Sequence, residues 1–150
     1  PGGTYRLKGN AGGEIRVCEP PRRLRVAWIA GEPAGPEDSS IVEVRLQPAS
    51  SGGTLLELAH AAVVPPDVCD QFGPGAVGVG WDLTLLGLAS HLAGVERGEA
   101  SQLAQGPAMR AFMIASSEEW GAALQVSGAD PGTVARTVAA TAAFYAPPIE

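Results

Sequence analysis

The chain has 150 residues, of which 45% are hydrophobic and 17% charged, a composition typical of one folded globular domain and not of a disordered chain. Its net charge of −6 argues against general nucleic-acid binding, and no apolar run is long enough to cross a bilayer. The two cysteines, Cys18 and Cys69, are expected to be free thiols in a reducing cytoplasm. The sequence thus predicts a single cytoplasmic domain without a nucleic-acid or membrane partner.

The first 63 residues alternate apolar and polar side chains in short runs that are separated by glycine, proline and serine. Alternation with a period of two is typical of strands with one buried face, and short turns between successive strands make them antiparallel. We therefore expect a five-strand antiparallel meander with turns at 10–13 and 50–53 and a loop at 31–38. The expected strands cover residues 4–9, 14–19, 22–31, 40–48 and 53–63.

One face of this sheet is expected to be apolar and to carry aromatic side chains. Strand parity gives the inward set as Tyr5, Leu7, Trp28, Val44, Leu46, Leu58 and His60. In the second strand, Ile15 and Val17 are expected to share a face, with Cys18 on the other. The opposite face of the sheet is basic, since six of the ten Lys and Arg residues lie within residues 1–30. This basic face is either an anion-facing patch or a solvated outer surface.

The second half predicts a helix able to cover the apolar face. Apolar residues recur at helical spacing over residues 75–94, and Gly94 suits the position that ends a helix. The apolar stripe of this helix is Val77, Trp81, Leu85, Leu88 and Leu92. Its glycines, Gly78 among them, are expected to let the helix approach the sheet closely. The preceding segment, with Pro65 and Pro66, is expected to be a loop that includes Cys69.

Residues 107–145 are expected to form further helices. A capping-box pattern at Ser116 and Glu119 predicts that one helix ends at about Ala115 and that a new one begins. Pro107 is expected to open the first of these helices in its first turn, and Gly128 to end the second. The pair Asp130-Pro131 is expected to cap and open the last helix.

Together these segments resemble a known family. The order GGTYRL, GEIRVCEPPRRLRVAW, GGTLLELAH and a GxGW helix start is similar to the AHSA1-type branch of the START/Bet v 1-like (SRPBCC) superfamily, over residues 1 to about 95. The tail from Gly106 is similar to an extension of some bacterial members. The resemblance implies an α+β helix-grip fold, in which a curved antiparallel sheet wraps a long helix around a deep cavity. It also implies a strand and two short helices ahead of Pro1. We therefore expect this sequence to be N-terminally incomplete, with an open sheet edge that favours a homodimer.

Two titratable residues could carry chemistry. His60 either lines the cavity, as a ligand contact or an acid/base group near neutral pH, or is a core histidine satisfied by its neighbours. Asp82 either points back at the sheet or compensates the helix dipole. His60 with Asp67, Cys69 and Asp70 matches no common metal-site spacing, so no metal site is predicted. No HExxH, paired CxxC, P-loop or GxSxG pattern occurs, and no cofactor is expected.

The leading prediction is a non-catalytic domain that binds a small hydrophobic or amphipathic molecule between sheet and helix. Its expected ligand contacts are Tyr5, Leu7, Trp28, Val44, Leu46, Leu58, His60, Trp81 and Leu85. Two alternatives stay open. One is an enzyme similar to the polyketide cyclases and hydrolases, with His60 and Asp82 as an acid/base pair. The other is a module that contacts a chaperone, as the name of the family implies.

Overall fold

The computed structural model describes residues 1–8, 10–30, 40–95 and 106–148. The chain divides into two compact units, Pro1–Val63, called here the sheet unit, and Val64–Glu150, called the helical unit. The first contains the strands and the second the helices, so the predicted α+β class is confirmed. The loop predicted at residues 31–38 lies outside the described residues.

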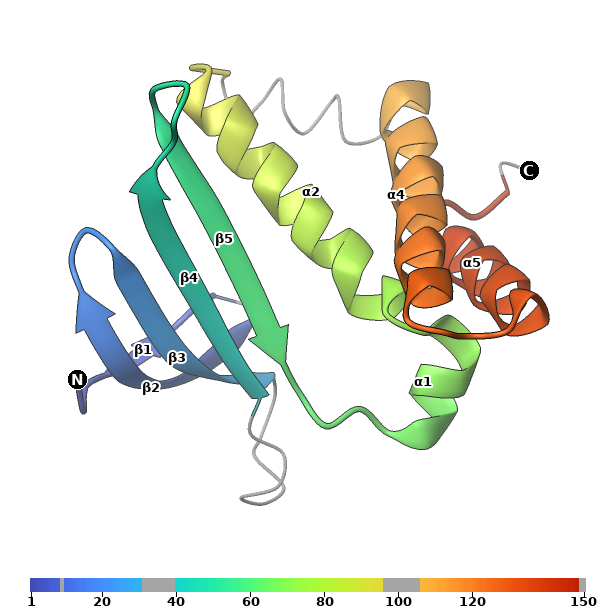
Figure 1. The fold of residues 1–150 in the computed structure, drawn as a ribbon, viewed down its shortest axis with the longest axis horizontal. Coiled ribbons are helices and arrows are strands. Elements are labelled where there is room, and N and C mark those ends of the chain that lie inside the picture. The colour runs from blue at the N-terminus through green and yellow to red at the C-terminus, as the bar shows by residue number, and fades with distance from the viewer. Residues whose placement is uncertain (9, 31–39, 96–105, 149–150) are drawn as a thin grey trace. The chain divides into compact units, whose positions relative to one another are not determined.

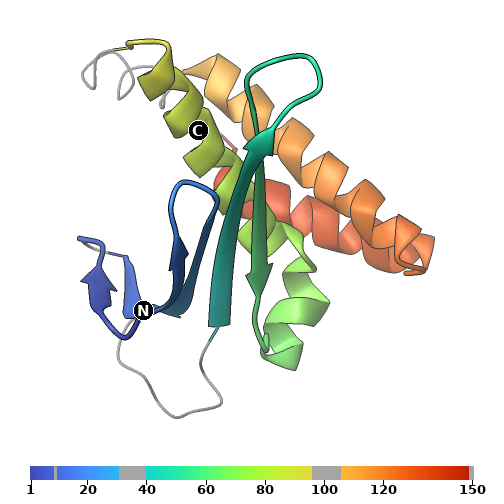
Figure 2. The same ribbon diagram turned by 60° about the vertical axis from the view of Figure 1, so that its left-hand side comes forward.

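The sheet unit is an antiparallel meander in which each strand pairs with the next along the chain, in the order β1-β2-β3-β4-β5 (Figure 1). Figure 2 shows the long β4–β5 hairpin of this unit. The strands are β1 (Thr4–Arg6), β2 (Ala11–Glu19), β3 (Arg23–Ala30), β4 (Ser40–Pro48) and β5 (Thr54–Ala61). The five predicted strands and their antiparallel order are confirmed.

β2 begins earlier than predicted, because glycines assigned to the turn at 10–13 belong to the strand. Gly13 pairs with Tyr5 of β1, so β2 has no side chain opposite the tyrosine ring. The Tyr5 hydroxyl donates a hydrogen bond of 2.8 Å to the carbonyl oxygen of Ala27 in β3. A Cβ atom at Gly13 would lie 2.4 Å from the same oxygen. A glycine is therefore required at this strand position, where it lets Tyr5 reach across β2.

A β-bulge in β2 corrects the predicted faces of that strand. Ile15 lies opposite Val26 but Val17 lies opposite Arg25, so the register shifts between Ile15 and Val17. Since neighbouring residues of β3 point to opposite faces, their partners Ile15 and Val17 do so too. The prediction that these two side chains share a face was wrong, because a bulge leaves no mark in the alternation of so short a strand.

The polar face of the sheet holds an ion-pair network centred on Glu43 of β4. Its Oε1 atom lies 3.1 Å from Arg23 Nε and 2.6 Å from Arg45 Nη2, and its Oε2 atom lies 3.6 Å from Arg25 Nε. Hydrogen bonding from Arg23 holds the pKa of the Glu43 carboxyl below its ordinary value. Arg45 also lies 3.5 Å from Glu57 of β5. Two arginines of the predicted basic N-terminal strands, Arg23 and Arg25, are therefore engaged by a carboxylate of their own sheet, as is Arg45 of β4.

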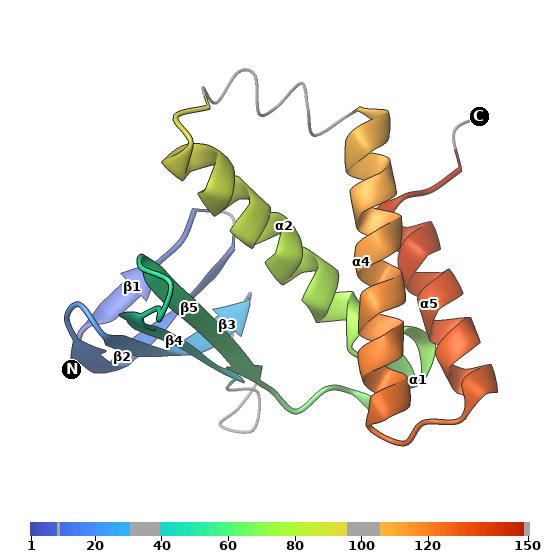
Figure 3. The ribbon, with the colours of Figure 1, turned by 45° about the horizontal axis from the view of Figure 1, so that its top comes forward.

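The helical unit contains the described helices α1 (Pro66–Phe72), α2 (Gly75–Leu92), α4 (Pro107–Val126) and α5 (Pro131–Tyr145). Figure 3 shows α4 beside α5. The segment around Cys69, predicted as a loop, is instead α1, because Pro66 stands in a first turn that does not use its missing N–H. The last helix is capped as predicted, since the Asp130 carboxylate accepts a 3.0 Å hydrogen bond from the Thr133 amide. Among the described helices, none is long and apolar enough to span a membrane.

α4 is one helix where the sequence predicted two. Ser116 was expected to cap a new helix, but its hydroxyl donates to Asp82 of α2 at 2.6 Å. Ser117 donates to the Met113 carbonyl oxygen of its own helix at 2.7 Å, so both hydroxyls are satisfied without a helix end. No proline or glycine occurs between residues 108 and 120, and nothing in the backbone therefore stops the helix.

Glycines set the closest helix contacts of this unit. A Cβ atom at Gly78 of α2 would lie 2.1 Å from the Trp120 ring of α4. One at Gly121 of α4 would lie 2.2 Å from the side chain of Val138 in α5. The helices approach so closely only because these positions have no side chain. The glycines of α2 were expected to let the helix approach the sheet. Gly78 instead packs against Trp120 of α4 within the helical unit.

Candidate functional site

The apolar face of the sheet carries a row of aromatic side chains, Tyr5, Trp28 and His60, which we call the aromatic row. The ring centroids of Tyr5 and Trp28 are 6.4 Å apart, and those of Trp28 and His60 are 6.3 Å apart with an interplanar angle of 62°. These residues stand on β1, β3 and β5, so the row crosses the sheet. The meander brings together residues that are far apart in sequence, and the predicted common face of the three rings is confirmed by these contacts.

Aliphatic side chains continue this face on β3, β4 and β5. Val42 lies opposite His60, and Val44 lies opposite Leu58, so these four side chains share the face of the aromatic row. Val42 is buried, and Val44 and Leu58 are half-buried. Val26, opposite Val42 on β3, is also buried and was missing from the predicted contacts, although its strand parity marked it.

The ends of this face differ from the prediction in detail. Leu46 of β4 is half-buried and lies opposite Leu56 of β5. Leu7 lies beyond the last residue of β1 and is 44% exposed. Its amide donates to the Ala11 carbonyl oxygen at 2.9 Å, which extends the β1–β2 register by one pair, so Leu7 closes the hairpin. Strand parity therefore still applies to Leu7, and its contact with a ligand stays a prediction.

The polar atoms of the aromatic row are uncharged at neutral pH. Burial lowers the pKa of the His60 imidazole from its ordinary value, and burial raises the pKa of the Tyr5 hydroxyl. The Tyr5 hydroxyl is already used in its hydrogen bond to the Ala27 carbonyl oxygen. A neutral imidazole can both donate and accept a hydrogen bond. The chemistry of this face therefore favours an apolar body with few polar groups over a charged molecule.

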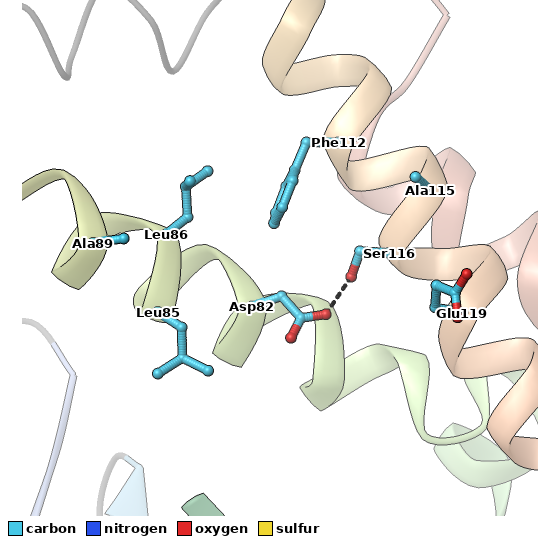
Figure 4. A pocket seen from close by; sticks show the side chains of 8 residues that line it. All are labelled: Asp82, Leu85, Leu86, Ala89, Phe112, Ala115, Ser116 and Glu119. Carbon is cyan, nitrogen blue, oxygen red and sulfur yellow. Dashed lines mark hydrogen bonds between the residues drawn. The ribbon is translucent and has the colours of Figure 1, made fainter. Parts of the chain in front are cut away.

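Asp82, the other predicted acid/base residue, is held by α4 within the helical unit (Figure 4). Its Oδ2 atom accepts hydrogen bonds from Ser116 Oγ at 2.6 Å and from Trp120 Nε1 at 2.9 Å. Two donors on one oxygen orient the carboxylate toward α4 and join the two helices. Neither donor was predicted from the sequence. Their spacing of four residues would have placed them on one helix face, had α4 been interpreted as continuous.

The other predicted contacts of α2 are Trp81 and Leu85, which are both half-buried. Leu85 lines a pocket between α2 and α4. Because these residues belong to the helical unit, their part in a ligand site with the sheet stays a prediction, as does the pairing of His60 with Asp82.

The parts of the chain that the structure describes contain no metal-ligating cluster. No group of three or more His, Cys, Asp or Glu side chains there could hold a metal ion. Cys18 and Cys69 are exposed free thiols. His91, on α2, is exposed.

Comparisons with known proteins agree with this architecture. The family model described as "Activator of Hsp90 ATPase homolog 1-like protein" (AHSA1) matches residues 1–93. The crystal structure of CalU16 from Micromonospora echinospora is similar, with 36% sequence identity and a TM-score of 0.58. The match covers 81% of this chain and 63% of the CalU16 chain, so the present chain spans less than two thirds of that protein. No curated protein sequence matches. With its α+β fold, the chain belongs to the AHSA1-like family.

Proposed function

We propose that this protein binds a small, uncharged hydrophobic or amphipathic molecule against the apolar face of its sheet. The observation that carries the proposal is the aromatic row, in which Tyr5, Trp28 and His60 follow one another across the sheet at about 6 Å. Aromatic side chains give large contact areas at low conformational cost, which suits them to ligand contact. The AHSA1-like family membership agrees with a ligand-binding role in general terms.

The size of the expected affinity follows from the surface involved. A ligand that removes about 200 Å² of apolar surface from water gains roughly 5 kcal/mol at about 25 cal/mol per Å². Ordering costs reduce this gain, so a dissociation constant on the order of 1 mM or weaker is expected for a ligand of this size, and a tighter one for a larger ligand.

Titration with a neutral fluorescent probe, N-phenyl-1-naphthylamine, tests the proposal. We expect saturable binding that is weakened by His60→Ala and by Leu58→Ala, because both side chains belong to the apolar face. Leu55→Ala is the matched control, since Leu55 stands on the same strand with opposite parity and is 52% exposed. Binding that is absent, or that responds equally to Leu58→Ala and Leu55→Ala, would refute the proposal.

Trp81→Ala extends the same titration to the helical unit. The sequence predicts that Trp81 contacts the ligand, so a loss of probe affinity in this variant would support that finer prediction. The cyclase-like and chaperone-contact alternatives have no observation of their own among the described residues. The predicted cytoplasmic location and homodimer likewise stay predictions of the sequence.

A further inference from the structure

The pocket between α2 and α4 lies wholly within the helical unit (Figure 4). Its volume is about 470 Å³, which is within the range of small-molecule sites. Its walls are mostly apolar, and Phe112 and Leu86 face the space between the two helices. The lining residues are Asp82, Leu85, Leu86, Ala89, Phe112, Ala115, Ser116 and Glu119.

The polar part of the pocket is acidic and has a fixed orientation. Asp82 Oδ2 is held by Ser116 and Trp120, whereas Oδ1 accepts no hydrogen bond from the described residues. Glu119 adds a second carboxylate three residues along α4 from Ser116, on the same side of the helix. The pocket therefore combines an apolar wall with two carboxylates and a hydroxyl.

Among the residues that the structure describes, no positive side chain lines the pocket beside these carboxylates. None of the lining residues is basic, and α2 contains no Lys or Arg. Arg110, the one Lys or Arg residue in the α4 sequence, donates to the Pro147 carbonyl oxygen. Residues 64–150 contain nine acidic and three basic residues, a net charge of −6, so the sequence of the helical unit accounts for the whole net charge of the chain. The electrostatic field of this unit favours a cation.

We propose that the pocket between α2 and α4 binds a small organic cation, an amine whose apolar body packs against Leu86 and Phe112 and whose ammonium group contacts Asp82 and Glu119. Such a ligand matches both parts of the pocket, since its carbon skeleton covers the wall and its charge meets the carboxylates. This site is independent of the site proposed on the sheet. It would bind a cation, whereas the sheet would bind an uncharged molecule.

Titration of the whole chain with 2-phenylethylamine, followed by amide and indole NMR signals, tests this proposal. Binding on the order of 0.1–1 mM is expected for a ligand of this size. The indole N–H of Trp120 is a built-in reporter, because it donates to the same carboxylate that receives the ammonium group. The neutral analogue 2-phenylethanol is expected to bind roughly 3- to 10-fold more weakly, since it cannot pair with the carboxylates.

Two variants and one matched control locate the site. Glu119→Gln is expected to weaken amine binding roughly 2- to 5-fold, while Glu118→Gln, the same charge change at the adjacent exposed residue, leaves it unchanged. Ala115→Leu fills the pocket from an exposed helix position and is expected to weaken binding about 10-fold or more. The proposal is overturned if the amine and the alcohol bind equally or if the two glutamine variants behave alike. It is also overturned if the amine does not saturate, or if its signals change on the aromatic row and not at Trp120.

Discussion

Replacing Gly78 by alanine tests whether the crossing of α2 and α4 depends on a missing side chain. The added Cβ atom would lie 2.1 Å from the Trp120 ring, where an ordinary contact needs at least 3.4 Å, so ring or helix must move by about 1.3 Å. Overpacking of this kind costs about 1–3 kcal/mol. Movement of the ring also weakens the Trp120 hydrogen bond to Asp82, worth about 1.5–3 kcal/mol because the acceptor is charged. Alanine gains about 1 kcal/mol of helix propensity, which leaves a net loss of roughly 2–4 kcal/mol.

Urea and thermal unfolding, followed by far-UV circular dichroism, measure this loss. We expect Gly78→Ala to lower the melting temperature by roughly 4–15 °C. Gly87→Ala is the matched control on the same helix, because no atom lies within 4 Å of the Cβ position there. It should raise the free energy of unfolding by up to about 1 kcal/mol. If both alanine variants were stabilised alike, or if Trp120→Ala did not relieve the effect of Gly78→Ala, the proposed crossing geometry would be refuted.

Three further predictions concern the sheet unit. Tyr5→Phe removes the hydrogen bond to the Ala27 carbonyl oxygen and should lower the free energy of unfolding by about 1 kcal/mol in urea titrations, whereas an unchanged value would show that the bond contributes nothing. Burial lowers the pKa of His60, so the unfolded chain binds more protons; stability should fall as pH drops below the unfolded value near 6.5 and level off below the folded pKa. His60→Gln should flatten that part of the pH profile, and an identical profile would assign the titration to other groups. Glu43→Gln should lower the free energy of unfolding more than Glu57→Gln does. The reason is that Glu43 contacts three arginines and its side chain is 11% exposed, against 52% for Glu57. The reverse order in urea titrations would contradict the network.

The strands could be predicted from sequence because each alternates clearly and each is flanked by turn residues. The aromatic row followed from the same parity, since Trp28 and His60 stand in strands whose alternation is unbroken. Two details did not follow. The bulge between Ile15 and Val17 depends on pairing with β3, and the strand role of Gly13 depends on a tyrosine that reaches across it. Both are tertiary effects that local patterns do not contain.

The helical unit was harder to predict, because contacts between its helices override local helix signals. The capping-box pattern at Ser116 competes with a tertiary hydrogen bond to Asp82, and the tertiary contact prevails. Gly78 is explained only by the Trp120 ring that lies against it. The pocket between α2 and α4 could not have been predicted either, because it requires α4 to be one continuous helix.

The most direct test of the central claim is to locate a bound apolar molecule on the protein. Intermolecular nuclear Overhauser effects between N-phenyl-1-naphthylamine and the isotope-labelled chain would identify the side chains that touch it. The proposal predicts contacts to the Trp28 indole, the His60 imidazole and the Leu58 methyl groups. Contacts confined to Leu86 and Phe112, or the absence of a saturable complex, would contradict it.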